Sequence, residues 1–381
     1  MNSKLRIGVV GMEGPEAGGA YSAEAQMINR LCNLEKECEI IFIQNKSNIL
    51  FLKKISKVVE FLSQIVFLKT FNPTIWLFTK RFMKFPMSRL EKRVANARVD
   101  LVFFVGQFDL AVQLRKTPFI VTIWDLGHRD LPQLPEMSHN REFEYREWRI
   151  RNIASKASWV VVDSEVTKEK LCRIYGIDLD RILTIPFVVK PQSLQSGNLR
   201  ENFAYYPAHF WAHKNHSILL YAIHALLENN LEPRKLILSG QDRGNKSYID
   251  NLVRELGIQD YVQYLGFLPS KEVEDLYKRA AVMVMPSILG PTNIPPLEAL
   301  SFGCPAVVST FGTTNLKFYD AILELDPFEI TAWSRVLASD YKLPLVDQYA
   351  FNLKQETLEE ENVNLIRNML KSHTKMIKTF K

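Results

Sequence analysis

The clearest signal in the chain is the segment Pro286-Ser-Ile-Leu-Gly-Pro-Thr-Asn-Ile-Pro-Pro-Leu-Glu-Ala-Leu-Ser-Phe-Gly-Cys-Pro305. The apolar run before it, Ala281-Val-Met-Val-Met285, predicts a buried strand. The paired prolines of the segment are tolerated in the first turn of a helix, which Gly303 and the final proline would end. Residues 306–309 predict the next strand. The order strand, loop, helix, strand is typical of a parallel α/β sheet, whose strand-to-helix loops bind anionic ligands.

The composition is that of an ordinary globular protein with room for two domains. The chain has 381 residues, of which 47% are hydrophobic and 24% are charged. Its four cysteines show no metal-like clustering, which predicts reduced thiols in a cytoplasmic protein. No secretory signal is visible, and no uncharged apolar run reaches the ~20 residues of a membrane-spanning helix.

Strands and helices alternate along both halves of the chain. Strands are predicted at residues 5–10, 39–44, 100–105, 118–123, 159–162 and 182–185, and again at residues 203–206, 235–239 and 262–265. A polar segment with Gly, Pro and Ser, residues 188–200, is predicted to link two domains. We therefore predict an α/β fold with an N-terminal domain at 1–190, a C-terminal domain at 191–355 and a charged helical tail at 356–381.

Residues 46–93 differ from the rest of the chain in charge. They hold eleven Lys and Arg against two Glu, with many aromatic and aliphatic residues between them. This pattern favours binding to an anionic membrane surface. The alternative is a pair of domain helices with their lysines in solvent. Nucleic acid is disfavoured because no recognised binding motif accompanies the charge.

Two loops in the first half are candidates for ligand contact. Gly11-Met-Glu-Gly-Pro-Glu-Ala-Gly-Gly-Ala20 fits neither a P-loop nor a dinucleotide fingerprint, so it is either a tight turn or a backbone surface close to a ligand. Trp124-Asp-Leu-Gly-His-Arg-Asp-Leu-Pro132 follows a predicted strand, where loops often carry function. Its His128 is either a structural hydrogen-bonding residue or a functional one.

In the second half, three loops or helix starts suggest an anionic ligand. A helix predicted to begin near Lys214 would place a cation at a helix N-terminus, which is unfavourable unless an anion also binds there. Thr292 and Asn293 can reach the same anion, and Glu298, expected in the first turn of its helix, can accept two hydrogen bonds from sugar hydroxyls. Each residue also has a simpler interpretation, as a solvated lysine, a helix cap or a dipole partner. Together they predict a diphosphate with a ribose, bound in a cleft between the domains.

Several motifs of the chain resemble a known family. They are Tyr206-Pro-Ala-His-Phe-Trp-Ala-His-Lys-Asn-His216, Leu265-Gly-Phe-Leu-Pro-Ser-Lys-Glu-Val-Glu-Asp-Leu-Tyr277, Gly290-Pro-Thr-Asn-Ile-Pro-Pro-Leu-Glu-Ala299, Thr122-Ile-Trp-Asp-Leu-Gly-His-Arg-Asp-Leu-Pro132 and Arg141-Glu-Phe-Glu-Tyr-Arg146. The set resembles the retaining glycosyltransferases of family 4 (glycosyl transferases group 1), in the subgroup of bacterial polysaccharide and lipopolysaccharide synthesis. The resemblance implies the GT-B fold, two Rossmann-like domains facing a central cleft.

The resemblance also implies a role for each matching residue. Lys214 would hold the donor diphosphate, and His128 would lie near the transferred sugar, so these two are the candidate catalytic residues. The implied donor-binding residues are Gly18, Gly19, His209, Lys214, Gly266, Thr292, Asn293 and Glu298. Among them, Glu298 would bind the ribose, and the loop at Gly266 would border the base. No metal and no cofactor are expected, since the nucleoside-diphosphate sugar is a substrate.

Two positions depart from the family pattern. The first acid of the family's paired-glutamate motif falls at Gly290, and the basic residue six before the lysine falls at Ala208, with His209 beside it as a stand-in. We interpret both as a variant donor pocket.

The expected function is transfer of a hexose, with GDP-mannose as the first candidate donor, to a glycan or lipid-linked acceptor at the inner face of the plasma membrane. The alternatives are a sugar-nucleotide epimerase of the same fold and a non-catalytic sugar-nucleotide-binding scaffold.

Overall fold

The computed structural model describes residues 4–11, 19–44, 66–67, 87–106, 108–194, 200–290, 294–311 and 321–380. Its contacts divide the chain into two compact units. Unit 1 comprises Met1–Trp124, Glu144–Ile185 and Glu360–Lys381, and unit 2 comprises Asp125–Phe143 and Pro186–Glu359. The chain passes from unit 1 to unit 2 after Ile185, just before the predicted linker at 188–200. Two segments depart from a simple division at one linker: residues 125–143 belong to unit 2, and residues 360–381 belong to unit 1.

Unit 1 is built on a parallel sheet. Among the described residues it has seven strands in the order β3-β2-β1-β4-β5-β6-β7. The strands are β1 (Leu5–Val10), β2 (Cys38–Gln44), β3 (Val66–Phe67), β4 (Leu101–Phe104), β5 (Phe119–Thr122), β6 (Trp159–Val162) and β7 (Ile182–Thr184). In register, Ile7 pairs with both Ile40 of β2 and Leu101 of β4. All four residues of β4 are fully buried, as expected of a central strand covered on both faces.

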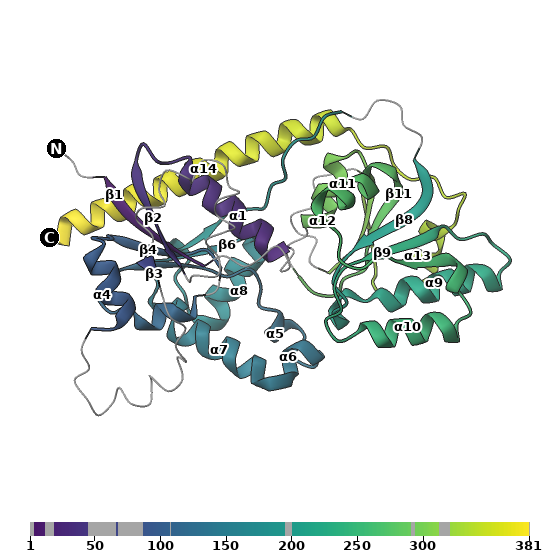
Figure 1. Ribbon diagram of the computed structural model, residues 1–381, viewed down its shortest axis with the longest axis horizontal. Coiled ribbons are helices and arrows are strands. Elements are labelled where there is room, and N and C mark those ends of the chain that lie inside the picture. Colours follow the sequence, from purple (N-terminus) through teal and green to yellow (C-terminus); the bar gives the residue numbers. More distant parts are fainter. Residues whose placement is uncertain are drawn as a thin grey trace. The chain divides into compact units, whose positions relative to one another are not determined.

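Helices cover both faces of this sheet (Figure 1). They are α1 (Gly19–Cys32), α4 (Arg89–Asn96), α7 (Glu142–Asn152), α8 (Glu165–Tyr175) and the unit 1 part of α14 (Gln348–Phe380). The core on one face joins Met27 and Ile28 of α1 to Ile366 and Met369 of α14. Local signals set the helix ends.

Helix α8 illustrates how these ends follow from the sequence. The Ser164 hydroxyl accepts from the N–H of Thr167 at 3.3 Å, and Gly176 ends the helix in the left-handed region at φ 66°. The helix therefore has the bounds that its flanking serine and glycine predict.

Unit 2 has a second parallel sheet. Among its described residues there are six strands, in the order β10-β9-β8-β11-β12-β13. The strands are β8 (Glu201–Pro207), β9 (Lys235–Ser239), β10 (Val262–Tyr264), β11 (Ala280–Met285), β12 (Ala306–Ser309) and β13 (Ile322–Leu325). The predicted α/β architecture is thus confirmed, with a Rossmann-type strand order in each unit. Strand β13 was not predicted.

The helices of unit 2 lie on both faces of its sheet (Figure 1). They are α9 (His216–Glu228), α10 (Lys246–Glu255), α11 (Ser270–Arg279), α12 (Ile294–Ser301) and α13 (Ile330–Leu337). Unit 2 also contains two short helices, α5 (Gly127–Asp130) and α6 (Pro135–Ser138). Helices α11 and α12 lie on one face, and α9, α10 and α13 on the other. The chain leaves the neighbouring strands β8 and β11 toward opposite sides of the sheet, so their carboxyl ends flank a topological switch point, where such sheets bind ligands.

Candidate functional site

The loop after β8 holds Lys214 just before a helix. Residues Ala212–Lys214 form a 3-10 turn, Asn215 follows with φ 51°, and α9 begins at His216. The helix predicted to begin near Lys214 is present but starts two residues later, because the left-handed conformation of Asn215 interrupts the helical path. Asparagine suits that place, since it tolerates the left-handed region. Its side-chain amide also donates to the carbonyls of Pro286 (3.3 Å) and Pro327 (2.8 Å).

The backbone around Lys214 is held on both sides. The Tyr206 hydroxyl donates to the Lys214 carbonyl at 2.9 Å. The His213 carbonyl accepts from the N–H of Ile288 at 2.9 Å and from the Ser287 hydroxyl at 3.3 Å. The loop after β8 is therefore fastened to the loop after β11, and Lys214 lies at the switch point between these two strands.

The environment of Lys214 favours an anionic ligand. The side chain is half-buried, and burial lowers the pKa of its ammonium to about 8, while Asp125 and Glu136 oppose that shift. Beside it, His216 is fully buried and stacks on Phe210 with ring centroids 4.4 Å apart. Burial lowers the pKa of His216 to about 3, so this ring is neutral. A bound anion would thus meet a partly desolvated ammonium and would stabilise its protonated form.

Two acids near Lys214 come from the first half of the chain. Residues 125–143 follow β5 in sequence but belong to unit 2. The Glu136 carboxylate accepts from the N–H of His213 at 3.0 Å, and Asp125 acts electrostatically on Lys214. A Cβ on Gly127 would lie 2.7 Å from the Leu289 side chain, so glycine allows this close approach. Sequence reasoning selected only His128 from this segment, because nothing local marks Asp125 or Glu136 as a neighbour of Lys214.

His128 itself lies in α5 with its side chain buried. Its ring meets that of Phe143 edge-on, with centroids 5.6 Å apart, and Arg129 lies over the same Phe143 ring. His128 and Lys214 thus belong to the same unit, although 86 positions separate them in sequence.

His209, Gly240 and Gly266 form a second part of the site. The N–H of Gln241 donates to Nδ1 of His209 at 2.9 Å, which places the proton of the neutral ring on Nε2. The His209 ring stacks on Phe267, which is 47% exposed. Gly240 lies close to the backbone on both sides. Its N–H donates to the Gly266 carbonyl at 2.8 Å, and a Cβ on Gly240 would lie 2.3 Å from the Ala208 carbonyl oxygen.

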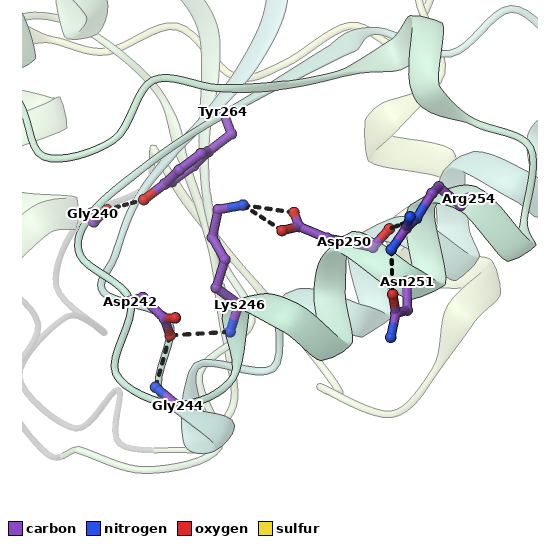
Figure 2. A network of polar contacts seen from close by, with 8 residues as sticks. All are labelled: Gly240, Asp242, Gly244, Lys246, Asp250, Asn251, Arg254 and Tyr264. Atoms are coloured by element: carbon purple, nitrogen blue, oxygen red, sulfur yellow. Dashed lines mark hydrogen bonds and ion pairs between the residues drawn. The ribbon is translucent and has the colours of Figure 1, made fainter.

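A polar network fixes the loop after β9 that contains Gly240 (Figure 2). The Tyr264 hydroxyl donates to the Gly240 carbonyl at 2.8 Å, and the Lys246 ammonium lies 4.1 Å from the centre of the Tyr264 ring. Asp250 binds that ammonium at 2.6 Å. Asp242 accepts from the N–H of Gly244 at 2.8 Å. Lys246 is therefore engaged within the network.

Glu298 lies in α12 beside Tyr277. It is the fifth residue of the helix, so the prediction of a place in the first turn was wrong. The paired prolines are the second and third residues of the helix and so stand in its first turn, as predicted. The Tyr277 hydroxyl donates to Oε2 of Glu298 at 3.1 Å. Burial raises the pKa of this carboxyl, and the Tyr277 hydrogen bond opposes that shift. One carboxylate oxygen is thus positioned by Tyr277, and the group has capacity for further donors.

The remaining predicted residues lie either outside the described residues or in unit 1. Gly18, Thr292 and Asn293 lie outside the described residues, as does most of the basic segment 46–93. Gly19 is the exposed first residue of α1, in unit 1. In the described parts of the chain, no cluster of three or more His, Cys, Asp or Glu could hold a metal ion. No helix there is long and apolar enough to cross a membrane.

Comparison with known proteins identifies families and relatives that this chain resembles. Residues 191–316 match the family of glycosyl transferases group 1, and residues 56–192 match glycosyltransferase family 4. The O-antigen chain mannosyltransferase RfbU of Salmonella typhimurium is 23% identical over 203 residues, which are 52% of this chain and 56% of that protein. The O-antigen chain mannosyltransferase B of Escherichia coli is 27% identical over 247 residues, 62% of this chain and 64% of that protein. The chain thus spans less than two thirds of either relative.

A solved structure shows the same fold over nearly the whole chain. The Anabaena protein HepE, in complex with UDP and glucose, matches with a TM-score of 0.66 at 14% identity, covering 97% of this chain and 100% of that one. At this identity the likeness shows the fold alone. Both halves of the chain are matched by the family models, which together run from residue 56 to residue 316, and so the chain belongs to the group 1, family 4 glycosyltransferases and has their GT-B fold.

Proposed function

We propose that the chain is a retaining glycosyltransferase that moves a hexose from a nucleoside-diphosphate sugar to a hydroxyl of a glycan or lipid-linked acceptor. Membership of the family supports the class of reaction. Two relatives named as O-antigen mannosyltransferases support a role in cell-surface polysaccharide synthesis and make GDP-mannose the first candidate donor.

The observation that carries the proposal is the environment of Lys214. Its ammonium is held at the switch point of the unit 2 sheet by a fastened backbone, and burial has lowered its pKa to about 8. A diphosphate is the leaving group of a nucleoside-diphosphate sugar, and its negative charge grows as the bond to the sugar breaks. A cation fixed in advance near that charge stabilises the transition state without reorganisation.

The proposed step is a substitution on one face of the sugar. The bond between C1 and the diphosphate oxygen breaks, and a bond between C1 and the acceptor oxygen forms on the same face. The acceptor proton passes to the departing phosphate oxygen, so the step uses no nucleophile from the protein. Glu298 would bind the ribose, His209 and the loop at Gly266 would border the nucleoside, and His128 would lie near the sugar. Gly18, Gly19, Thr292 and Asn293 are proposed to line the diphosphate.

We also propose that residues 46–93 hold the enzyme at the anionic cytoplasmic face of the membrane, near a lipid-linked acceptor. Their excess of Lys and Arg, eleven against two Glu, supports this role. Sedimentation with phosphatidylglycerol vesicles should deplete the protein from solution at low salt and much less at high salt. Equal binding to neutral phosphatidylcholine vesicles would contradict the proposal.

The direct test of function is turnover of GDP-mannose with a lipid-linked glycan acceptor, comparing wild type with Lys214→Ala. Wild type should transfer mannose, and the variant should lose transfer while keeping its fold by circular dichroism. Lys271→Ala is the control, since it removes an exposed lysine of α11. Unchanged turnover of Lys214→Ala would contradict the role of Lys214.

The same assay separates the alternatives. Conversion of the donor without acceptor would indicate an epimerase. Donor binding with no turnover in either mixture would indicate a non-catalytic scaffold. A panel of nucleoside diphosphates in a thermal-shift assay would identify the base, because a ligand that binds the native state raises its stability.

A further inference from the structure

Helix α6 brings Glu136 to the residue next to Lys214. The segment that contains α6, residues 125–143, is joined in sequence at both ends to unit 1 but belongs to unit 2. Pro135 opens α6, so Glu136 stands in its first turn. Glu136 has no role in the reaction proposed above.

The Glu136 carboxylate binds His213 through a single oxygen. Oε1 accepts from the backbone N–H of His213 at 3.0 Å and lies 2.6 Å from Nδ1 of its ring. Both side chains are largely buried, with 8% of Glu136 and 15% of His213 exposed. Burial raises the pKa of Glu136, but the hydrogen bonds from His213 outweigh this effect and lower it overall. The carboxylate is therefore ionised at neutral pH and is a strong acceptor for both donors.

These contacts hold His213 in addition to those that its carbonyl makes with the loop after β11. Its carbonyl is held by Ile288 and Ser287, and its N–H and ring are held by Glu136. The next peptide carries Lys214, whose own carbonyl is held by Tyr206. Because the peptide plane is rigid, fixing His213 at both its N–H and its carbonyl leaves Lys214 little freedom to change its backbone direction.

We propose that Glu136 is a positioning residue for the donor diphosphate: it holds Lys214 in place through His213. The inference rests on the proposed role of Lys214 and adds a residue from the first half of the chain to the site. Glu136 does not touch the ligand in this scheme. Its loss should weaken the interaction of Lys214 with the diphosphate, because misplacement of a charged group by about 1 Å is enough to lower activity about 100-fold.

The experiment measures the affinity of the full chain for GDP and for UDP, and kcat and KM with GDP-mannose. Glu136→Ala should raise the Kd of the nucleoside diphosphate and lower kcat/KM by about 10- to 100-fold. Glu136→Gln keeps an acceptor oxygen in the same place, so it should recover most of this loss. Glu144→Gln, at an exposed glutamate eight residues further on, is the control and should behave as wild type.

A double-mutant cycle with Lys214→Ala tests whether Glu136 acts through Lys214. If it does, Glu136→Ala should have no further effect on the Kd of GDP or UDP in the Lys214→Ala background. Independent effects that add would overturn the inference, as would a Glu136→Ala variant with wild-type Kd and kcat/KM. A purely structural role would lower the melting temperature and leave the two effects additive.

The two proposals fail in different ways. If Lys214→Ala itself leaves the affinity for GDP and UDP unchanged, the proposed function of Lys214 is wrong whatever Glu136 does. If Lys214→Ala weakens binding and Glu136→Ala does not, only the positioning role is wrong.

Discussion

Raising the pH should weaken donor binding, because burial makes Lys214 lose its proton easily. Burial lowers the pKa of its ammonium to about 8, and Asp125 and Glu136 only partly oppose this. A bound diphosphate favours the charged form and so raises the pKa again. The affinity for the donor should therefore be highest at pH values below 8 and should fall above pH 8. It should stop falling once the pH exceeds the higher pKa that Lys214 has in the complex.

The magnitude follows from proton linkage. With a pKa of about 8 in the free enzyme, the Kd should rise about tenfold between pH 7 and pH 9, which is a loss of about 1.4 kcal/mol. The nearby histidines do not contribute in this range. Burial lowers the pKa of His213, and that of His216 to about 3, so both rings are neutral throughout.

The assay is titration calorimetry with GDP-mannose at pH 7, 8 and 9 and constant ionic strength. Lys214→Arg is the matched control, because a guanidinium keeps its proton over this range and any titration of the ligand affects both proteins equally. The wild-type Kd should rise about tenfold relative to that of the variant. Parallel pH dependences of the two proteins would refute the reasoning.

Three further substitutions test the local geometry. Asn215→Ala should lower the free energy of unfolding by about 2–3 kcal/mol, since it removes two hydrogen bonds and a residue that tolerates φ 51°. Asn215→Gly should recover the part of this loss that comes from the backbone conformation, as measured by denaturant unfolding. Equal losses of unfolding free energy in both variants would show that the backbone conformation does not contribute. Gly290→Ala should destabilise by about 1–3 kcal/mol because Gly290 has φ 110°. Gly19→Ala, where a Cβ meets no atom within 4 Å, is its control in thermal unfolding. Glu298→Gln should weaken binding of a ribonucleoside diphosphate about tenfold, the value of one charged hydrogen bond, but not binding of its 2′,3′-dideoxy analogue. Equal losses for both ligands would rule out the ribose contact.

At Gly290, where the family resemblance implies an acid, the backbone conformation disfavours any side chain. Its φ of 110° lies in a region that residues with a side chain rarely adopt. A glutamate at this position would need a different backbone path. We therefore expect Gly290→Glu to lose stability and gain no activity.

The alternation of strands and helices could be read from the chain alone, because it depends on contacts close in sequence. Central parallel strands are buried on both faces, so a short run such as Leu101–Phe104 is apolar throughout. Helix ends depend on single residues, as Ser164 and Gly176 show for α8. The family motifs are local as well, and they identified Lys214 and Glu298 as candidates before their surroundings were known.

The surroundings of those candidates needed the tertiary structure. No periodicity indicates that Asn215 adopts a left-handed conformation, because two distant carbonyls stabilise its amide there. Strand β13 and helix α13 were not predicted, since Ile322–Leu325 is short and α13 gains its stability by packing against α9.

By itself, the sequence determined the class of fold, most of the strands and helices of both halves and the family to which the chain belongs. Only the tertiary structure decided that residues 125–143 belong with the second half, and that Glu136 meets His213 across 77 positions of sequence. The physical reason is that a hydrogen bond between distant segments depends on how whole elements pack. Local propensity and spacing carry no record of that packing, so the partner of the residue beside Lys214 could be found only in the folded chain.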